Sequence, residues 1–253
     1  MLPRLTATRY VTPLREGGSL PAVVEADDDG TYVLKFRGAA QGLRVLVAEV
    51  IVGEIARALG LLVPDLAVVE LRREIARYEA DQEVQDLLVA SLGSNLGVDF
   101  LPGALGYDGS LPPDRETAER IVWLDALTTN VDRTWRNPNL LVWHGGTWVI
   151  DHGAALYQHH SWENTAPDPG RFARAPFDLS THVLRAIAPS IRDRHREFAA
   201  VAGAAIPAAV DAVPDEWLAT TPELPDPAAN RLMYVRMLTE RLANPDAWIV
   251  EDT

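Results

Sequence analysis

The sequence predicts an α+β protein in which a small antiparallel β-rich part with one helix precedes a larger, mainly helical part. Short β-prone runs separated by turn residues fill the first 36 positions. A helical pattern follows at residues 44–59, and amphipathic helices dominate from residue 114 onward. We place the boundary after residue 92, which gives an N-terminal β-rich domain over 1–92 and a C-terminal helical domain over 93–253.

Composition indicates a soluble globular protein. The chain has 253 residues, 47% of them hydrophobic, which is enough for a substantial core. The net charge of −13 argues against a nucleic-acid-binding surface. Because cysteine is absent, disulfides, thiol nucleophiles and cysteine-ligated zinc are excluded. No apolar run reaches the ~20 residues that span a bilayer, and the start lacks a signal-peptide pattern, so we expect no membrane insertion and a cytoplasmic location.

The N-terminal strands form a predicted antiparallel meander. Asp29-Gly30 is a strong hairpin signal between the second strand and the third. The earlier turn contains Gly17, Gly18 and Ser19, whose backbone N–H groups could contact phosphate oxygens, although the same residues also suit a plain turn. The predicted strands are 10–12, 22–25 and 31–36.

Lys35 and the helix after it form the next feature. Alternation along the third strand places Lys35 on the same face as Val33, where it is either paired with an acidic group or turned to solvent. The helix 44–59 contains two glutamates, Glu49 and Glu54. Because they are five residues apart, they point to different faces, and only one of them can meet Lys35.

The remaining elements are less uniform. Residues 66–71 are predicted to form a strand, whereas 81–89 fit a helix or a strand equally well. The later helices are amphipathic and separated by proline or glycine, which is typical of a scaffold. They are predicted at 117–128, 178–188, 191–212 and 228–242.

The polar stretch after the helix 117–128 has the clearest chemical pattern. Two short β-prone runs, 140–143 and 147–150, flank His144-Gly145-Gly146 and predict a tight hairpin. Such a hairpin brings Asp132, Asn137 and Asp151 toward one end. Carboxylate and amide oxygens are ligands that suit Mg²⁺. The alternative is an ordinary polar loop followed by a hairpin, because Asn, Asp and Pro are common in loops.

The order Asp, Asn five positions later, and Asp after a hairpin resembles protein-kinase-like phosphotransferases. The sequence motifs at 130–133, 136–139 and 150–153 are most similar to those of the HipA-like kinase family and less similar to those of phosphatidylinositol kinases. Val131 precedes Asp132, and His152 stands where ordinary protein kinases have phenylalanine. Both departures agree with the HipA-like group.

This resemblance implies a two-lobed protein-kinase-like fold that uses ATP and Mg²⁺. It implies that Asp132 orients or accepts the proton of a substrate hydroxyl, while Asn137 and Asp151 bind Mg²⁺. Lys35 would hold phosphate oxygens, and Glu49 matches the position of the glutamate that fixes this lysine. Glu54 would then be a solvated charge.

The resemblance also assigns parts of the nucleotide site. Gly17, Gly18 and Ser19 would contact phosphate, and Ser19 lies in the region where HipA-like toxins phosphorylate themselves. Residues 87–90 would form the last strand of the small lobe and the hinge to adenine. Residues 93–103 would then leave the hinge and line the mouth of the site.

The acceptor is the least defined partner. The resemblance implies transfer of the ATP γ-phosphate to a hydroxyl, such as a protein serine or threonine. A small-molecule or lipid-headgroup kinase and a non-catalytic nucleotide-binding scaffold are the alternatives. HipA-like toxins have DNA-binding partners, but this chain is shorter and is expected to lack their extra N-terminal domain, so we do not extend the toxin role to it.

Several neighbouring side chains allow plainer explanations. Arg133 fits a structural ion pair as well as a phosphate contact, and Asn130 is expected to brace the loop. His152, His159 and His160 match no familiar zinc spacing, and we expect surface histidines.

Overall fold

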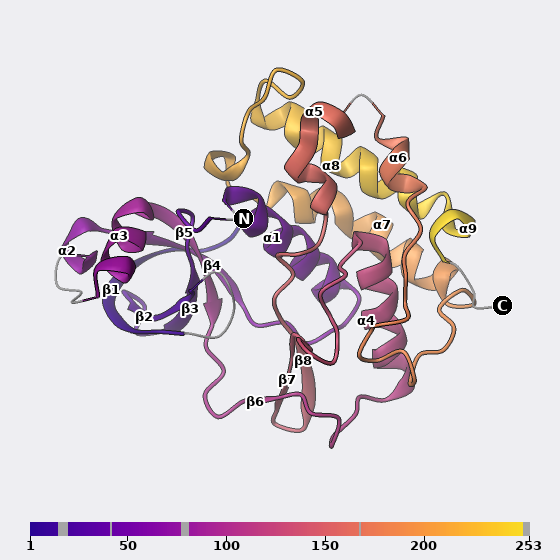
Figure 1. Ribbon diagram of the computed structural model, residues 1–253, viewed down its shortest axis with the longest axis horizontal. Helices are drawn as coiled ribbons and strands as arrows, with labels where there is room; N and C mark the ends of the chain where they lie inside the picture. Colours follow the sequence, from indigo (N-terminus) through magenta and orange to yellow (C-terminus); the bar gives the residue numbers. More distant parts are fainter. Residues whose placement is uncertain (15–19, 41, 77–80, 167, 250–253) are drawn as a thin grey trace. The chain divides into compact units, whose positions relative to one another are not determined.

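The computed structural model describes residues 1–14, 20–40, 42–76, 81–166 and 168–249 (Figure 1). The chain folds into two compact units. The first comprises Met1–Leu46 and Pro64–Pro102, and the second comprises Val47–Val63 and Gly103–Thr253. Both strands and helices are present, as an α+β class requires.

Five strands close the first unit into a barrel in the order β1-β2-β3-β5-β4. Neighbouring strands are antiparallel except β1 and β4, which pair in parallel from Arg4–Val68 to Thr6–Glu70. The predicted antiparallel meander of β1, β2 and β3 is confirmed. The expectation of an antiparallel β lobe is wrong only for the pair of β1 and β4. The parallel pair joins strands far apart in sequence, and it removes the open edges that a meander would expose. The strands are β1 (Arg4–Pro13), β2 (Ala22–Ala26), β3 (Thr31–Lys35), β4 (Leu66–Leu71) and β5 (Gly93–Asp99).

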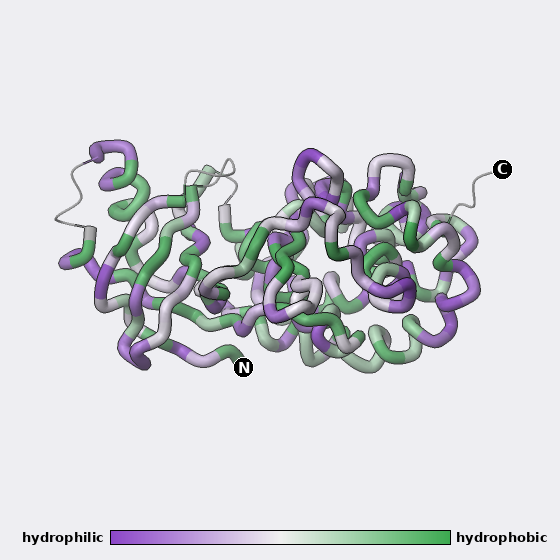
Figure 2. Tube along the Cα trace, turned by 90° about the horizontal axis from the view of Figure 1, so that it is seen from below, coloured by the Kyte–Doolittle hydropathy of each residue, from purple (hydrophilic) through white to green (hydrophobic). Residues whose placement is uncertain are grey.

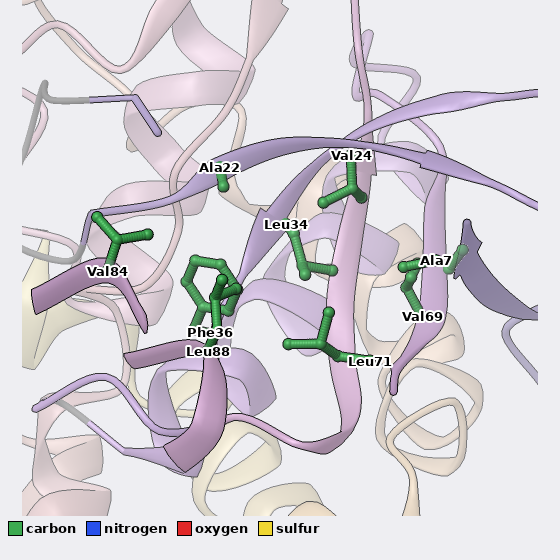
Figure 3. Packing of buried hydrophobic residues seen from close by; sticks show 10 residues of the cluster. Ala7, Ala22, Val24, Leu34, Phe36, Val69, Leu71, Val84 and Leu88 are labelled. Carbon is green, nitrogen blue, oxygen red and sulfur yellow. The ribbon is translucent and has the colours of Figure 1, made fainter. Parts of the chain in front are cut away.

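The barrel interior holds the core of the first unit. Leu34 of β3 packs there with Val24 of β2 and Val69 of β4, and Phe36 follows on the same side (Figure 3). Burial of each large apolar side chain stabilises the fold by about 1.5–3 kcal/mol. Gly97 of β5 allows close packing, because a Cβ there would lie 2.6 Å from Cγ2 of Val69.

Two short helices, α2 (Arg73–Ala76) and α3 (Gln82–Ala90), belong to the first unit. The Asp81 side chain caps α3 by accepting hydrogen bonds from the backbone N–H groups of Glu83 and Val84. The prediction of a last strand and hinge at 87–90 is therefore wrong. The last strand is β5, which occupies the segment expected to line a site mouth.

The helix α1 (Leu43–Ala58) confirms the predicted helix at 44–59. It is buried on most of its circumference, as expected for a helix that is apolar nearly all round. Gly60, with a φ of +78°, follows its end in the left-handed conformation that glycine adopts without strain.

The second unit is mainly helical and also carries a small sheet. The helices predicted at 117–128 and 228–242 are confirmed, and Asp114 and Asp226 cap them. The helix predicted at 191–212 begins later, at His195. The elements are α4 (Arg115–Thr128), η1 (Tyr157–Ser161), α5 (Trp162–Thr165), α6 (Gly170–Ala173), α7 (His195–Asp211), η2 (Asp215–Trp217), α8 (Pro227–Leu242), α9 (Pro245–Trp248) and the strands β6 (Leu105–Gly106), β7 (Leu140–Trp143) and β8 (Gly146–Val149).

The helix predicted at 178–188 does not form. Turns occupy this segment, and backbone bonds link His182 to Leu179 and Val183 to Arg133. The imidazole of His182 is also bound elsewhere, by Asp125. The bonds to Arg133 and Asp125, which are far away in the sequence, outweigh the local helical preference.

Hydrophobic and hydrophilic stretches alternate along the chain (Figure 2). In the part of the chain that the structure describes, no helix is both long enough and apolar enough to cross a membrane.

Candidate active site

The candidate site begins in the loop that follows the C-terminal end of α4. Thr129 takes the left-handed conformation, with a φ of 57°, and its N–H donates to the Asp125 carbonyl. The Asn130 N–H donates to the same carbonyl at 2.9 Å. The helix therefore stops here, and the chain turns into the polar loop.

A buried ionic network fixes this loop. Arg133 and Asp125 form an ion pair with an Nε–Oδ2 distance of 2.6 Å, and both side chains are 0% exposed. Asn130 Nδ2 donates to Asp125 Oδ1 at 3.0 Å, and His182 Nε2 lies 3.0 Å from Asp125 Oδ2. Burial alone raises the pKa of Asp125, but the positive charge of Arg133 and the bond to His182 lower it to about 2. The Asp125 carboxylate is therefore ionised, as the pair with Arg133 requires.

Arg133 also joins the loop to the hairpin. Its Nη1 donates to the carbonyl of Asn139 at 2.5 Å and to that of Ile150 at 3.3 Å. The Ile150 N–H donates to the Asn139 carbonyl at 3.1 Å. One guanidinium thus holds the residue before β7 and the residue after β8. Asp151 is the next residue after Ile150, so the backbone that carries its side chain is held by Arg133.

The predicted hairpin is confirmed, with β7 and β8 paired from Leu140–Val149 to Trp143–Gly146. Asp151 beyond it is exposed and has a φ of 55°. Aspartate tolerates the left-handed conformation better than most residues do.

Two amides hold the Asp132 carboxylate. Asn137 Nδ2 donates to Asp132 Oδ2 at 2.8 Å, and Asn139 Nδ2 donates to the same oxygen at 3.3 Å. The Asp132 N–H donates to Asn130 Oδ1 at 3.3 Å. Asn130 therefore braces the loop as expected, while Asn137 directs its amide nitrogen at Asp132 and keeps its Oδ1 for another partner.

The other predicted site residues lie elsewhere in the chain. Lys35 ends β3, is half-buried, and lies on the strand face opposite Leu34. Glu49 of α1 is buried, whereas Glu54 forms an ion pair with Arg57 at 3.7 Å. Lys35 and Glu49 belong to different compact units, and their pairing stays a prediction. Gly17, Gly18 and Ser19 lie outside the described residues.

The structure decides between two alternatives for Arg133 and corrects one expectation for the histidines. Arg133 makes the structural ion pair, one of the two interactions considered for it. The histidines are not all at the surface, because His152 and His159 are buried. His159 Nδ1 lies 2.9 Å from the Tyr234 hydroxyl, which explains how the core accepts its polar ring. Within the described ranges, no group of three or more His, Asp or Glu side chains could hold a metal ion.

Sequence reasoning missed Asp125 and His182. Asp125 stands in the apolar run from Ile121 to Leu127, and a carboxylate in such a run indicates a buried charge that needs a partner. No local signal identifies His182 as that partner, since 57 residues separate the two.

Comparisons with known proteins extend this description. The model of the HipA-like kinase family matches residues 8–251. No curated protein matches the chain. Among solved structures, the Helicobacter pylori proinflammatory kinase CtkA is similar, with a TM-score of 0.59 and 11% identity over 92% of this chain and 90% of that chain. At this identity the likeness to CtkA shows the fold, and the family match identifies the relationship. The chain belongs to the HipA-like kinase family.

Proposed function

We propose that this protein is an ATP- and Mg²⁺-dependent phosphotransferase that moves the ATP γ-phosphate to a hydroxyl group, with a protein serine or threonine as the acceptor. Family membership supports a kinase-like function. The observation that carries the proposal is the Asp132 carboxylate, held by Asn137 and Asn139 in a loop that Arg133 anchors.

Asp132 is the proposed base. Its Oδ2 accepts the two amide hydrogen bonds, and no hydrogen bond to Oδ1 forms among the described residues. Oδ1 would therefore take the hydroxyl proton as the acceptor oxygen bonds to the γ-phosphorus and the bond to the β-phosphate oxygen breaks. Because the carboxylate is already fixed, little reorganisation is needed at the moment of transfer.

The residues of the loop fit a magnesium ion. Asn137 Oδ1 and the Asp151 carboxylate are hard oxygen ligands, and the Asn139–Ile150 bond holds their two segments together. Two protein ligands leave room for phosphate oxygens and water, which Mg²⁺ usually retains. When bound, the ion would neutralise charge on the phosphates. We therefore expect metal and nucleotide to bind together.

The nucleotide-holding residues are assigned by family resemblance. Lys35 would hold phosphate oxygens, Glu49 would orient Lys35, and residues 17–19 would contact phosphate. The nucleotide-binding lobe, predicted over 1–92, would then also include β5, which closes the barrel, and the later part of 93–253 would act as the catalytic lobe. The half-buried position of Lys35 and the burial of Glu49 support these roles.

Asp132→Asn tests the base. We expect the variant to keep the Mg-ATP affinity of the wild type and to lose slow ATP hydrolysis and self-phosphorylation by about a hundredfold or more. Asp168→Asn is the matched control, because Asp168 is an exposed carboxylate of the same unit that pairs with Arg174. Unchanged turnover in Asp132→Asn would contradict the assignment. A wild type that binds Mg-ATP without any turnover would favour a nucleotide-binding scaffold.

A further inference from the structure

A cavity of about 320 Å³ lies beyond the hairpin, in the segment that contains η1, α5 and α6. Its size falls at the lower end of the range for small-molecule sites, about 300–1,000 Å³. Its wall is mostly apolar and includes Phe172 and Ala175, and polar side chains contribute from Tyr157, Gln158 and Arg171. None of the proposed catalytic residues lines it. The cavity is therefore separate from the site proposed for phosphoryl transfer.

A buried positive charge lies directly behind this wall. Arg241 is 0% exposed, and its Nη1 donates to the carbonyls of Phe172 and Ala175, each at 2.7 Å. Its guanidinium carbon lies 5.1 Å from the centre of the Phe172 ring. The other guanidinium bonds go to the Ala126 carbonyl, and no carboxylate pairs with Arg241 among the described residues. Carbonyl oxygens solvate this cation but leave its unit charge uncompensated.

Arg171 adds a second positive charge at the cavity. It is exposed, and its guanidinium makes no hydrogen bond or ion pair within the part of the chain that the structure describes. The neighbouring Arg174 instead pairs with Asp168 at 3.4 Å. The nearby carboxylate of Glu163 accepts hydrogen bonds from the Ser161 hydroxyl and the Asn164 amide.

We propose that this cavity is a second ligand site, which binds a small organic anion. The carboxylate or phosphate of the ligand would pair with Arg171, and its apolar body would lie against Phe172 and Ala175. Arginine suits such groups because its planar fork binds them with two hydrogen bonds. In a chain with a net charge of −13, two arginines without carboxylate partners beside one cavity give it a local attraction for anions.

The cavity wall is attached to the start of the catalytic loop. The Leu156 N–H donates to the Thr128 carbonyl at 2.8 Å. The Thr129 hydroxyl donates to the Thr128 carbonyl at 2.7 Å and lies 3.4 Å from Gln158 Oε1. Arg241 reaches the carbonyl of Ala126 in the last turn of the same helix. A ligand held by these walls would therefore stabilise the junction between α4 and the loop.

Titration of phenyl phosphate into the nucleotide-free protein tests the site, with inorganic phosphate and phenol as probes of its two halves. We expect phenyl phosphate to bind saturably by calorimetry and to raise the melting temperature of the protein. Inorganic phosphate alone and phenol alone should each bind more weakly. Arg171→Gln should weaken phenyl phosphate at least about tenfold, because a charged hydrogen bond is lost. Arg174→Gln is the matched control and should bind as the wild type does.

Asp151→Asn and Arg171→Gln together separate this site from the nucleotide site. Asp151→Asn should keep phenyl phosphate binding, and Arg171→Gln should keep Mg-ATP binding. Ala175→Met should block phenyl phosphate by filling the cavity. The proposal is overturned if the wild type does not bind phenyl phosphate, if Arg174→Gln weakens binding as much as Arg171→Gln does, or if Mg-ATP displaces phenyl phosphate from the protein.

Discussion

The Asp125 carboxylate accepts hydrogen bonds from Asn130 and Arg133 and contacts the imidazole of His182, and all of these groups are buried. The positions of Asp132 and Asn139 depend on it, because Arg133 and Asn130 hold the backbone on either side of Asp132. The buried ion pair of Asp125 and Arg133 therefore positions the catalytic loop, which no exposed ion pair in the described part of the second unit contacts in this way.

We expect Asp125→Asn to lower the free energy of unfolding by about 3–5 kcal/mol, because it leaves the buried Arg133 charge without its anion. Urea unfolding of both proteins measures this loss. Asp168→Asn is the control: its pair with Arg174 is more than half exposed on both sides and should contribute no more than about 1 kcal/mol. Equal losses in the two variants would show that the Asp125 network does not hold the loop.

His195 gives the protein a predictable pH dependence. Trp123 Nε1 donates to its Nδ1, and its Nε2 lies 3.2 Å from the Leu242 carbonyl, which fixes the neutral ring. Burial lowers the pKa of His195 below its usual 6.5. Below pH 6.5 the unfolded chain therefore gains a proton that the native ring takes up only at lower pH. The contribution of His195 to stability is present above pH 6.5 and is lost as the pH falls toward its native pKa.

His195→Gln tests this dependence, because the amide can replace both hydrogen bonds without titrating. Urea unfolding between about pH 7.5 and about pH 5.5 should show a smaller loss of stability in the variant than in the wild type. Parallel curves for the two proteins would mean that His195 does not titrate differently in the folded and unfolded states.

At the scale of elements, the barrel requires β5 to approach β4 closely. Gly97→Ala would place its Cβ 2.6 Å from Val69, so we expect a loss of about 1–3 kcal/mol from overpacking. Gly106→Ala in β6 is the control, since its Cβ would meet no atom within 4 Å. Thermal unfolding of both variants measures the difference. A Gly97→Ala variant as stable as Gly106→Ala would contradict the close packing of β4 and β5.

Element prediction succeeded where local signals were complete. The hairpin 140–150 has β-prone runs and a glycine turn, and the helix of residues 44–59 has apolar spacing and a terminal glycine. Residues 81–89 fitted a helix or a strand, and the fold resemblance suggested a strand at 87–90, although Asp81 before Gln82 is a normal helix-capping signal. At 178–188 the sequence has a helical pattern, but hydrogen bonds between this segment and residues 125–134 stabilise turns there instead of a helix.

At the scale of the whole molecule, the sequence supported the α+β class and the family, because the polar loop, its hairpin and Asp-His-Gly lie close together in the chain. The parallel seam between β1 and β4 and the Asp125–His182 contact could not be predicted in this way. Each joins segments that are far apart, where neither periodicity nor spacing carries a signal. The candidate residues of the loop were thus predictable, whereas the network that holds them was not.

The proposal of a nucleotide-dependent kinase depends on the coupling of Mg²⁺ and ATP through Asp151. Calorimetric titration of ATP into the purified protein, with and without Mg²⁺, measures that coupling, and Asp151→Asn with the Asp168→Asn control assigns it to the residue. We expect Mg²⁺ to tighten ATP binding in the wild type and in the control, and to have no such effect in Asp151→Asn. Failure of the wild type to bind ATP, or an equal effect of Mg²⁺ in Asp151→Asn, would contradict the proposed function.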